Sequence, residues 1–85
     1  MARFELRVKA SVAKDLRRVA KRDVKKVLAR IAGLRDDPRP PGCEKLSGSG
    51  LYRVRQGVYR IIYSIDETQI VVEVVKVGQR GAVGR

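Results

Sequence analysis

Residues 51–63, LYRVRQGVYRIIY, are the stretch that decides the expected fold of this chain. Polar and apolar residues alternate on both sides of Gln56-Gly57, which predicts two short strands, 51–55 and 58–65, joined by a tight turn. Side chains on a strand point to alternate faces of its sheet. The hairpin is therefore expected to have one apolar face and one face that carries arginines.

The three arginines of the hairpin, Arg53, Arg55 and Arg60, are predicted to share that second face. A two-residue turn at the expected position sets Arg53 directly opposite Arg60. Like charges that face each other destabilise a sheet by up to about 1 kcal/mol. One interpretation is a solvated face with Glu73 as counter-ion. The other is a phosphate clamp, because a guanidinium fork binds two phosphate oxygens at once; we favour the clamp because three such groups converge.

The remaining periodicities predict one α+β domain over residues 1–85, in the order β-α-α-β-β-β. Residues 3–9 alternate like a half-buried strand, and the nearly continuous apolar run 69–77 predicts an interior strand. We expect an antiparallel-rich sheet of about four strands with a helical hairpin packed on one face. The apolar sheet face is formed by Tyr52, Val54, Tyr59, Ile61 and Tyr63. The helical stripes are Val12, Leu16 and Val19, after an N-cap at Ser11, and then Val24, Val27, Ile31 and Leu34.

A break between the helices is expected near residues 21–22. The second helix should end before Pro38, because the residue before a proline avoids the α region. Residues 35–50, RDDPRPPGCEKLSGSG, contain all three prolines and are predicted to form a loop. Residues 44–46 are the one patch of this loop in which short ordered structure is expected.

The charge of the chain points to a polyanionic partner. Twenty Lys and Arg against nine Asp and Glu give a formal net charge of +11, which favours nucleic acid over an acidic protein or an anionic membrane. Many of the cations lie in the helical region, where the alternative to RNA binding is a solvated outer face. The residues predicted to bind RNA are Lys14, Arg17, Arg18, Lys21, Arg22 and Lys25, together with Lys45 in the loop.

Histidine is absent from the chain, and cysteine occurs once, at Cys43. Triads and dyads that need a histidine are therefore excluded, and the scattered carboxylates have no metal-ligand spacing, so no metal site is expected. An enzyme of this composition would act through electrostatic stabilisation by Arg and Lys. The single cysteine and the lack of a signal-peptide or membrane-length apolar run predict a cytoplasmic protein.

The run KLSGSGLYRVRQGVYRIIYSID at 45–66, followed by IVVEVVKVGQR at 70–80, resembles the RelE/ParE superfamily of bacterial and archaeal toxins. For the RelE branch, the resemblance implies a ribosome-dependent endoribonuclease that cleaves mRNA in the A site and so inhibits translation. The 2′-hydroxyl of the substrate attacks the adjacent phosphate. The resemblance also implies a cognate antitoxin and the mRNA-bearing ribosome as partners, and no cofactor.

Four arginines match the basic positions of the RelE branch. By this resemblance, Arg60 and Arg80 would stabilise the charged transition state, and Arg53 and Arg55 would orient the phosphate and help to activate the hydroxyl. These four residues are therefore the predicted catalytic set.

The chain differs from many active members at two places. Gln79 stands where they carry a histidine or lysine, and Gly84 stands where a tyrosine stacks on a substrate base. Two alternatives are considered beside the nuclease: a ParE-like inhibitor of DNA gyrase, and an RNA-binding or interaction protein without catalysis on the same fold. The four matching arginines favour the nuclease.

Overall fold

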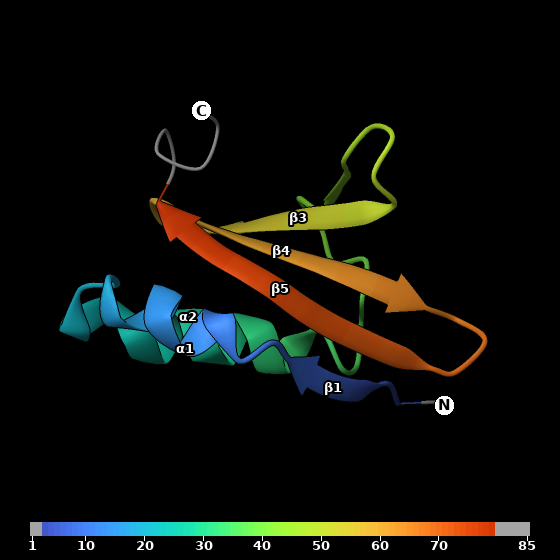
Figure 1. Ribbon diagram of the computed structural model, residues 1–85, viewed down its shortest axis with the longest axis horizontal. Coiled ribbons are helices and arrows are strands. Elements are labelled where there is room, and N and C mark those ends of the chain that lie inside the picture. Colours follow the sequence, from blue (N-terminus) through green and yellow to red (C-terminus); the bar gives the residue numbers. More distant parts are fainter. Residues whose placement is uncertain (1–2, 80–85) are drawn as a thin grey trace.

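The computed structural model describes residues 3–79, which form a sheet and a layer of two helices beneath it (Figure 1). The helices are α1 (Ser11–Arg17) and α2 (Lys21–Gly33). The strands are β1 (Glu5–Val8), β2 (Glu44–Lys45), β3 (Leu51–Gln56), β4 (Tyr59–Asp66) and β5 (Val71–Gln79). None of the helices in this range is long and apolar enough to span a membrane.

The strands form one five-stranded sheet in the order β1-β5-β4-β3-β2. Among the described strands, β1 and β5 pair in parallel and the other neighbours are antiparallel. The predicted α+β fold with an antiparallel-rich sheet is therefore confirmed. The fifth strand, β2, arises because Glu44 and Lys45 pair with Arg53 and Tyr52, within the patch where order was expected. The position of β5 between β1 and β4 confirms that it is an interior strand.

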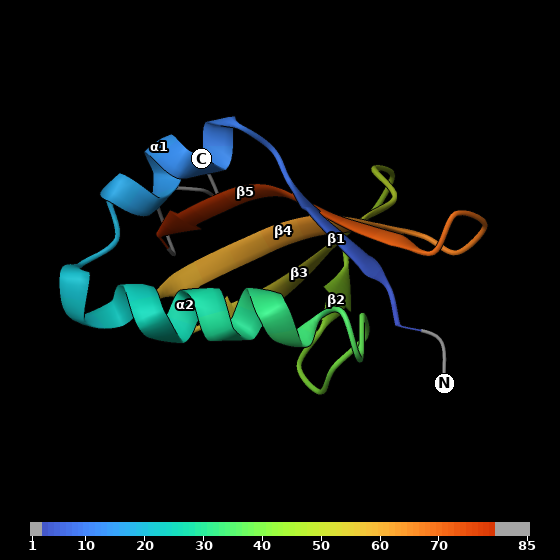
Figure 2. The same cartoon turned by 90° about the horizontal axis from the view of Figure 1, so that it is seen from below.

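The two helices cover one face of the sheet, with α1 beside β5 and α2 beneath β3 (Figure 2). Both predicted helical stripes face the core, in which Val12, Val27 and Ile31 are buried. The break between the helices covers residues 18–20, slightly earlier than predicted. This arrangement confirms the helical hairpin on one sheet face.

The predicted N-cap at Ser11 is wrong. Ser11 is the first residue of α1, and the cap position is Ala10, which makes no side-chain capping bond. The chain turns directly from β1 into the helix, so the N–H groups of Val12 and Ala13 donate to the carbonyls of Lys9 and Ala10. These backbone acceptors serve the first turn, and a side-chain oxygen is not needed there.

The β3–β4 hairpin turns one residue later than predicted. Gln56 pairs with Tyr59, so Gly57 and Val58 form the two-residue turn. Gly57 has a φ of 61°, and glycine with positive φ at the first central position is typical of a type II′ turn.

This displacement changes the cross-strand partners and preserves the faces. Arg60 pairs with Arg55, and Arg53 pairs with Ile62, so the predicted Arg53–Arg60 pair is wrong. Moving a two-residue turn by one residue shifts each partner by two positions, and an even shift leaves every side chain on its own face. The three arginines therefore share one face, as predicted. We call this face, opposite the helices, the open face.

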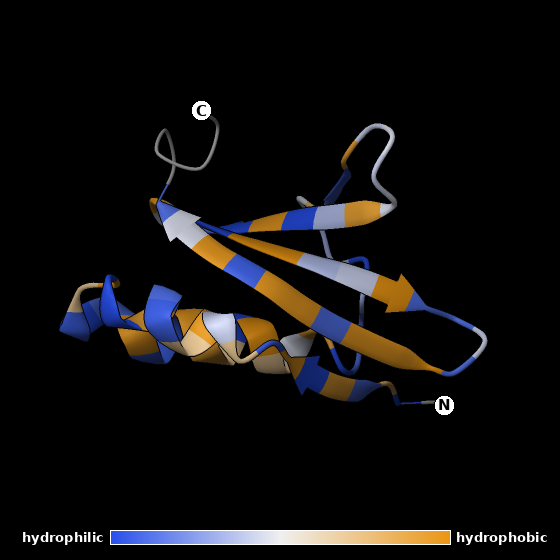
Figure 3. Ribbon diagram, in the orientation of Figure 1, coloured by the Kyte–Doolittle hydropathy of each residue, from blue (hydrophilic) through white to orange (hydrophobic). Residues whose placement is uncertain are grey.

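Apolar residues recur along β3, β4 and β5 (Figure 3), and along β4 the burial alternates between the core and the open face. On β4, Tyr59, Ile61 and Tyr63 point to the helices and are at most 7% exposed. Burial of each such apolar side chain contributes about 1.5–3 kcal/mol. The predicted apolar face of the hairpin is thus confirmed as part of the core.

Candidate active site

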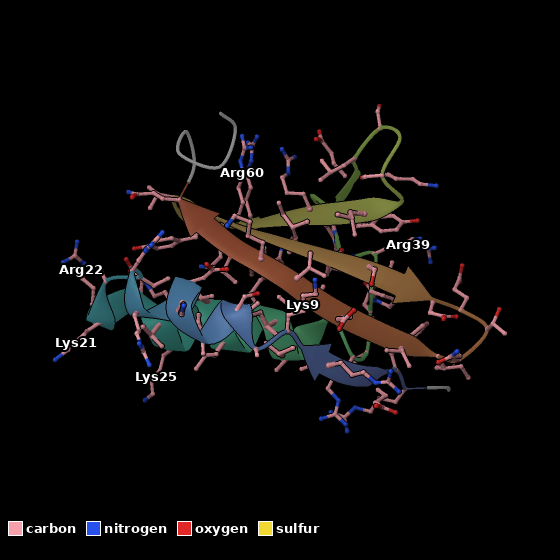
Figure 4. The ribbon with its side chains drawn as sticks, in the orientation of Figure 1. Lys9, Lys21, Arg22, Lys25, Arg39 and Arg60 are labelled. Atoms are coloured by element: carbon pink, nitrogen blue, oxygen red, sulfur yellow. The ribbon has the colours of Figure 1, made fainter. Side chains whose placement is uncertain are left out.

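The arginine cluster, Arg53, Arg55 and Arg60, lies on the open face near the β3–β4 turn. Arg55 and Arg60 are direct cross-strand partners, and Arg53 lies in the neighbouring row, opposite Ile62. The Arg60 side chain points away from the helix layer (Figure 4). Side chains of directly opposed residues start about 4.5–5.5 Å apart, so the two guanidinium groups of Arg55 and Arg60 can reach one phosphate.

Arg53 has different surroundings from Arg60. Its side chain is 10% exposed, and its Nη2 lies 2.6 Å from Oε1 of Glu44. The counter-ion of Arg53 is therefore Glu44; Glu73, the predicted one, pairs with Ser64 in a different row of the sheet. Within the described residues, the buried Nε atoms of Arg53 and Arg60 make no hydrogen bond. Both arginines therefore retain an unsatisfied Nε donor, and the difference between them is that a carboxylate compensates the charge of Arg53.

Glu44 is a residue of this site that the sequence analysis missed. Its carboxylate is 65% exposed although its oxygen contacts the largely buried guanidinium of Arg53. Its pairing with Arg53 puts it on the open face. The only available signal was its place in residues 44–46, since a two-residue strand has too few residues to show alternation.

Contacts on the helix side of the sheet hold the loop that leads to β2. The Tyr63 hydroxyl donates to the carbonyl of Pro38 at 2.7 Å. Burial raises the pKa of the Tyr63 hydroxyl, so it stays protonated and able to donate. Arg39 donates to Glu67 at 3.1 Å and to the Tyr52 hydroxyl at 3.3 Å. The loop is thereby fastened to both β3 and the β4–β5 turn, which fixes the strand that carries the site carboxylate.

The predicted RNA-binding residues of the helices lie away from the arginine cluster. Lys21, Arg22 and Lys25 project from the helix layer, on the other side of the sheet from Arg60 (Figure 4). All six predicted helix residues have exposed side chains: Lys14, Arg17, Arg18, Lys21, Arg22 and Lys25. The structure does not bring them into the cluster, and their binding to RNA stays a prediction.

Lys45 also lies off the open face. It pairs with Tyr52, whose ring packs with Tyr63 at 5.9 Å between centres. The Nζ of Lys45 lies 6.0 Å from the centre of the Tyr52 ring. The predicted role of Lys45 in RNA binding is therefore separate from the arginine cluster.

A groove of about 810 Å³ lies between the α1–α2 connection and the β3–β4 turn. Four of its lining residues are cations, Arg17, Arg18, Arg22 and Lys26. The turn residues Gln56, Gly57 and Val58 line it as well. We call it the basic groove. It approaches the arginine cluster through the turn, because the lining residues 56 and 59 adjoin Arg55 and Arg60 in the chain.

Two predicted features lie outside the described residues. Arg80 and Gly84 follow the last described residue, Gln79, so the assignment of Arg80 to the catalytic set stays a prediction. Gln79 pairs with Tyr59 at the start of β4, one position from Arg60. Within residues 3–79, no three His, Cys, Asp or Glu side chains are grouped so that they could hold a metal ion.

Residues 6–83 match the family model described as the ParE toxin of the type II toxin–antitoxin system parDE. No curated protein gives a significant match. A chain of the archaeal RelE–RelB complex from Pyrococcus horikoshii OT3 is 31% identical, with a TM-score of 0.81 over 95% of this chain and 98% of that one.

Two further structures share the fold. A chain of the RelBE2 toxin–antitoxin complex from Mycobacterium tuberculosis is 25% identical, with a TM-score of 0.80 over 92% of this chain and 99% of that one. A YoeB/ParE toxin from Agrobacterium tumefaciens is 22% identical, with a TM-score of 0.73 over 91% and 99% of the two chains. The family match spans nearly the whole sequence, and the RelE relative aligns over almost all of both chains. The chain therefore belongs to the ParE toxin family of type II toxin–antitoxin systems, within the RelE/ParE superfamily.

Proposed function

We propose that this toxin cleaves mRNA on the ribosome. One observation carries the proposal: Arg55 and Arg60 face each other on the open face of the sheet. Two guanidinium groups that converge from neighbouring strands can both donate hydrogen bonds to the oxygens of one bound phosphate. The likeness to a RelE chain over nearly its full length supports the RNA-cleaving branch.

The proposed reaction is an attack by the 2′-hydroxyl oxygen on the adjacent phosphorus. The P–O bond to the 5′-oxygen of the next nucleotide breaks, and a 2′,3′-cyclic phosphate and a 5′-hydroxyl end remain. The transition state has more negative charge on its non-bridging oxygens than the ground state. Arg55 and Arg60 stabilise that charge, and Arg80 joins them by the resemblance to RelE. Loss of one such donor commonly slows a reaction ~10²–10³-fold.

The attacking hydroxyl must lose a proton, and the arginines cannot take it because a guanidinium stays protonated. We assign this role to Glu44, the carboxylate that lies 2.6 Å from Arg53. Arg53 then orients the carboxylate and the phosphate. The leaving 5′-oxygen takes its proton from water.

The role of Glu44 is tested by Glu44→Gln. The amide oxygen still accepts a hydrogen bond from Arg53 but no longer compensates its buried charge, so some loss of thermal stability is expected, and the amide cannot act as a base. Cleavage is expected to fall ~10²–10⁴-fold, the usual contribution of a general base. Single-turnover cleavage of mRNA on programmed ribosomes measures the effect. A Glu44→Gln protein with the wild-type rate would remove Glu44 from the mechanism.

The proposed partners are the mRNA-bearing ribosome and a cognate antitoxin. The exposed cations of the helices and of the basic groove supply attraction to ribosomal RNA phosphates. Relatives of this chain are found in RelE–RelB and RelBE2 complexes, which supports an antitoxin partner of the same kind here. No cofactor enters the proposed reaction.

DNA gyrase is the second candidate target. The matching family model is that of the ParE toxin, and a YoeB/ParE toxin shares the fold. The same exposed cations would then serve to bind gyrase or its DNA instead of the ribosome.

Induced expression of this chain alone distinguishes the candidates. We expect new mRNA 5′ ends inside translated codons, and no cuts when Arg60→Ala is expressed at the same level. Arg7→Ala is the matched control, because it removes an exposed arginine from β1, away from the cluster. Intact mRNA with gyrase-dependent DNA damage would favour the second candidate. Absence of both effects would leave an interaction protein without catalysis.

A further inference from the structure

We propose that Asp15, a residue of the helix layer, positions the strand that borders the arginine cluster. The geometry of this proposal depends on an irregularity in β5. Its effect on cleavage rests on the proposed nuclease function. Asp15 contacts Val77 and Lys76 of β5 and, among the described residues, none of the arginines of the cluster, so it acts through the strand.

The irregularity is a β-bulge at Val75. Tyr63 of β4 pairs with Val74, but the next residue back, Ile62, pairs with Lys76. Val75 is therefore an extra residue on β5 without a partner on β4. An extra residue reverses the alternation of the strand beyond it, so residues that would have faced one side face the other.

This reversal decides which residue of β5 lies beside Arg60. In the structure Gly78 pairs with Arg60, and Val77 points to the core, where it is 2% exposed. If the register before the bulge continued, Val77 would pair with Arg60 on the open face, and Lys76 would face the helices. Glycine has no side chain, so β5 adds no side chain beside Arg60 in this row of the sheet. A valine there would occupy this space with two methyl groups.

Asp15 holds the bulge from the helix side. Its Oδ2 accepts a hydrogen bond from the backbone N–H of Val77 at 3.0 Å. Its side chain is 14% exposed, and its Oδ1 lies 4.0 Å from Nζ of Lys76. The pairing of β5 with β1 ends at Val74, so β1 offers no acceptor to this N–H. Without Asp15 the N–H of a buried residue would lack an acceptor, which folded proteins rarely tolerate.

The charge of the helix layer gives independent support. Residues 14–30 contain eight cations and only two carboxylates, Asp15 and Asp23. A carboxylate on a basic helix opposes the binding of RNA, so attraction to a polyanion does not explain either residue. Both instead reach the sheet, because Asp23 accepts from the Tyr59 hydroxyl at 3.3 Å. Asp23 therefore provides a matched control that has a helix-to-sheet bond but no bond to the bulge.

The structural test uses solution NMR of the full chain. In wild type we expect a slowly exchanging Val77 amide and a cross-strand contact between Arg60 and Gly78. Asp15→Ala should lose both signals. Asp15→Asn should keep them, because an amide oxygen also accepts the hydrogen bond, and Asp23→Ala should keep them as well. Retention of both signals by Asp15→Ala would overturn the proposal.

The functional test is single-turnover cleavage at saturating programmed ribosomes. Asp15→Ala should cleave about 10- to 100-fold more slowly, as expected when reacting groups are displaced by about 1 Å, while its affinity for ribosomes is unchanged. Asp15→Asn and Asp23→Ala should cleave at the wild-type rate. Gly78→Val should reproduce the slow cleavage while its Val77 amide remains protected. A fall in ribosome affinity that accounts for the whole effect of Asp15→Ala would refute positioning.

Two results keep this proposal separate from the proposed function. A wild-type protein that does not cleave would refute the nuclease, and the NMR signals would still decide whether Asp15 holds the bulge. If Asp15→Ala does not fold, Gly78→Val carries the test. Full cleavage by folded Gly78→Val would overturn the claim that the bulge clears a space beside Arg60.

Discussion

At the scale of single residues, Arg53 and Arg60 of the cluster have different surroundings. Arg53 is nearly buried and has a carboxylate partner at 2.6 Å. Arg60 lies opposite another arginine and forms no ion pair with a carboxylate in the described part of the chain, and its Nε, like that of Arg53, is buried without a hydrogen bond. A residue that serves only the fold would be expected to have a carboxylate partner, as Arg53 does. The surroundings of Arg60 cost the fold free energy, which is typical of a residue retained for binding.

Replacement of Arg60 separates these two contributions. Arg60→Ala should reduce single-turnover cleavage ~10²–10³-fold, because a donor to the transition state is lost. Its free energy of unfolding should equal that of wild type or exceed it by up to about 1 kcal/mol, because an opposed pair of cations is removed. Urea unfolding measures the second quantity on the same samples.

Arg60→Lys provides the matched control for charge. It keeps the positive charge but loses the planar fork that contacts two phosphate oxygens. We expect cleavage between that of wild type and that of Arg60→Ala. Wild-type cleavage by Arg60→Ala would exclude Arg60 from the reaction, and a large loss of stability would assign it to the fold.

At the scale of elements, alternation predicted the faces of the hairpin correctly but not its turn. Gly57 can occupy the second central position of a turn at Gln56-Gly57 or the first position of a turn at Gly57-Val58. The sequence is compatible with both. In the structure the second is formed, with Val58 half-exposed at the tip and Gln56 paired with Tyr59. Both turns keep the arginines on one face, so the prediction of a cluster did not depend on the choice.

Other elements could not be predicted because the residues that stabilise them lie elsewhere in the sequence. The bulge at Val75 interrupts an apolar run, and apolar residues on both faces give no signal for a change of alternation. Its support comes from Asp15, which lies 62 residues away from Val77 in sequence. The strand β2 likewise exists through its pairing with β3. Local patterns therefore predicted the long elements, and tertiary contacts determined the short ones that complete the site.

At the scale of the whole molecule, the arginine cluster and the basic groove lie at the same end of the sheet. The β3–β4 turn separates them, with Arg55 and Arg60 on one side and the cations of the groove on the other. Lys21 and Lys25 are exposed but do not line the groove. A long polyanion that occupies the cluster can therefore reach the groove around the turn. The helix cations then fall into two groups that net charge alone does not distinguish.

Salt dependence of ribosome binding tests this division. One triple variant replaces groove cations, Arg17→Ala, Arg18→Ala and Arg22→Ala. The other replaces cations outside the groove, Lys14→Ala, Lys21→Ala and Lys25→Ala. Each lowers the formal net charge from +11 by three, so a purely long-range attraction would be weakened equally in both. Each lost phosphate contact flattens the log–log salt dependence of affinity by ~0.7–0.9. We expect the slope of log affinity against log salt concentration to fall by about two to three in the groove variant and by less than about one in the outer variant.

Equal slopes in the two variants would show that the groove has no special role in ribosome binding. Slopes equal to that of wild type in both variants would show that all six residues form only a solvated helix face.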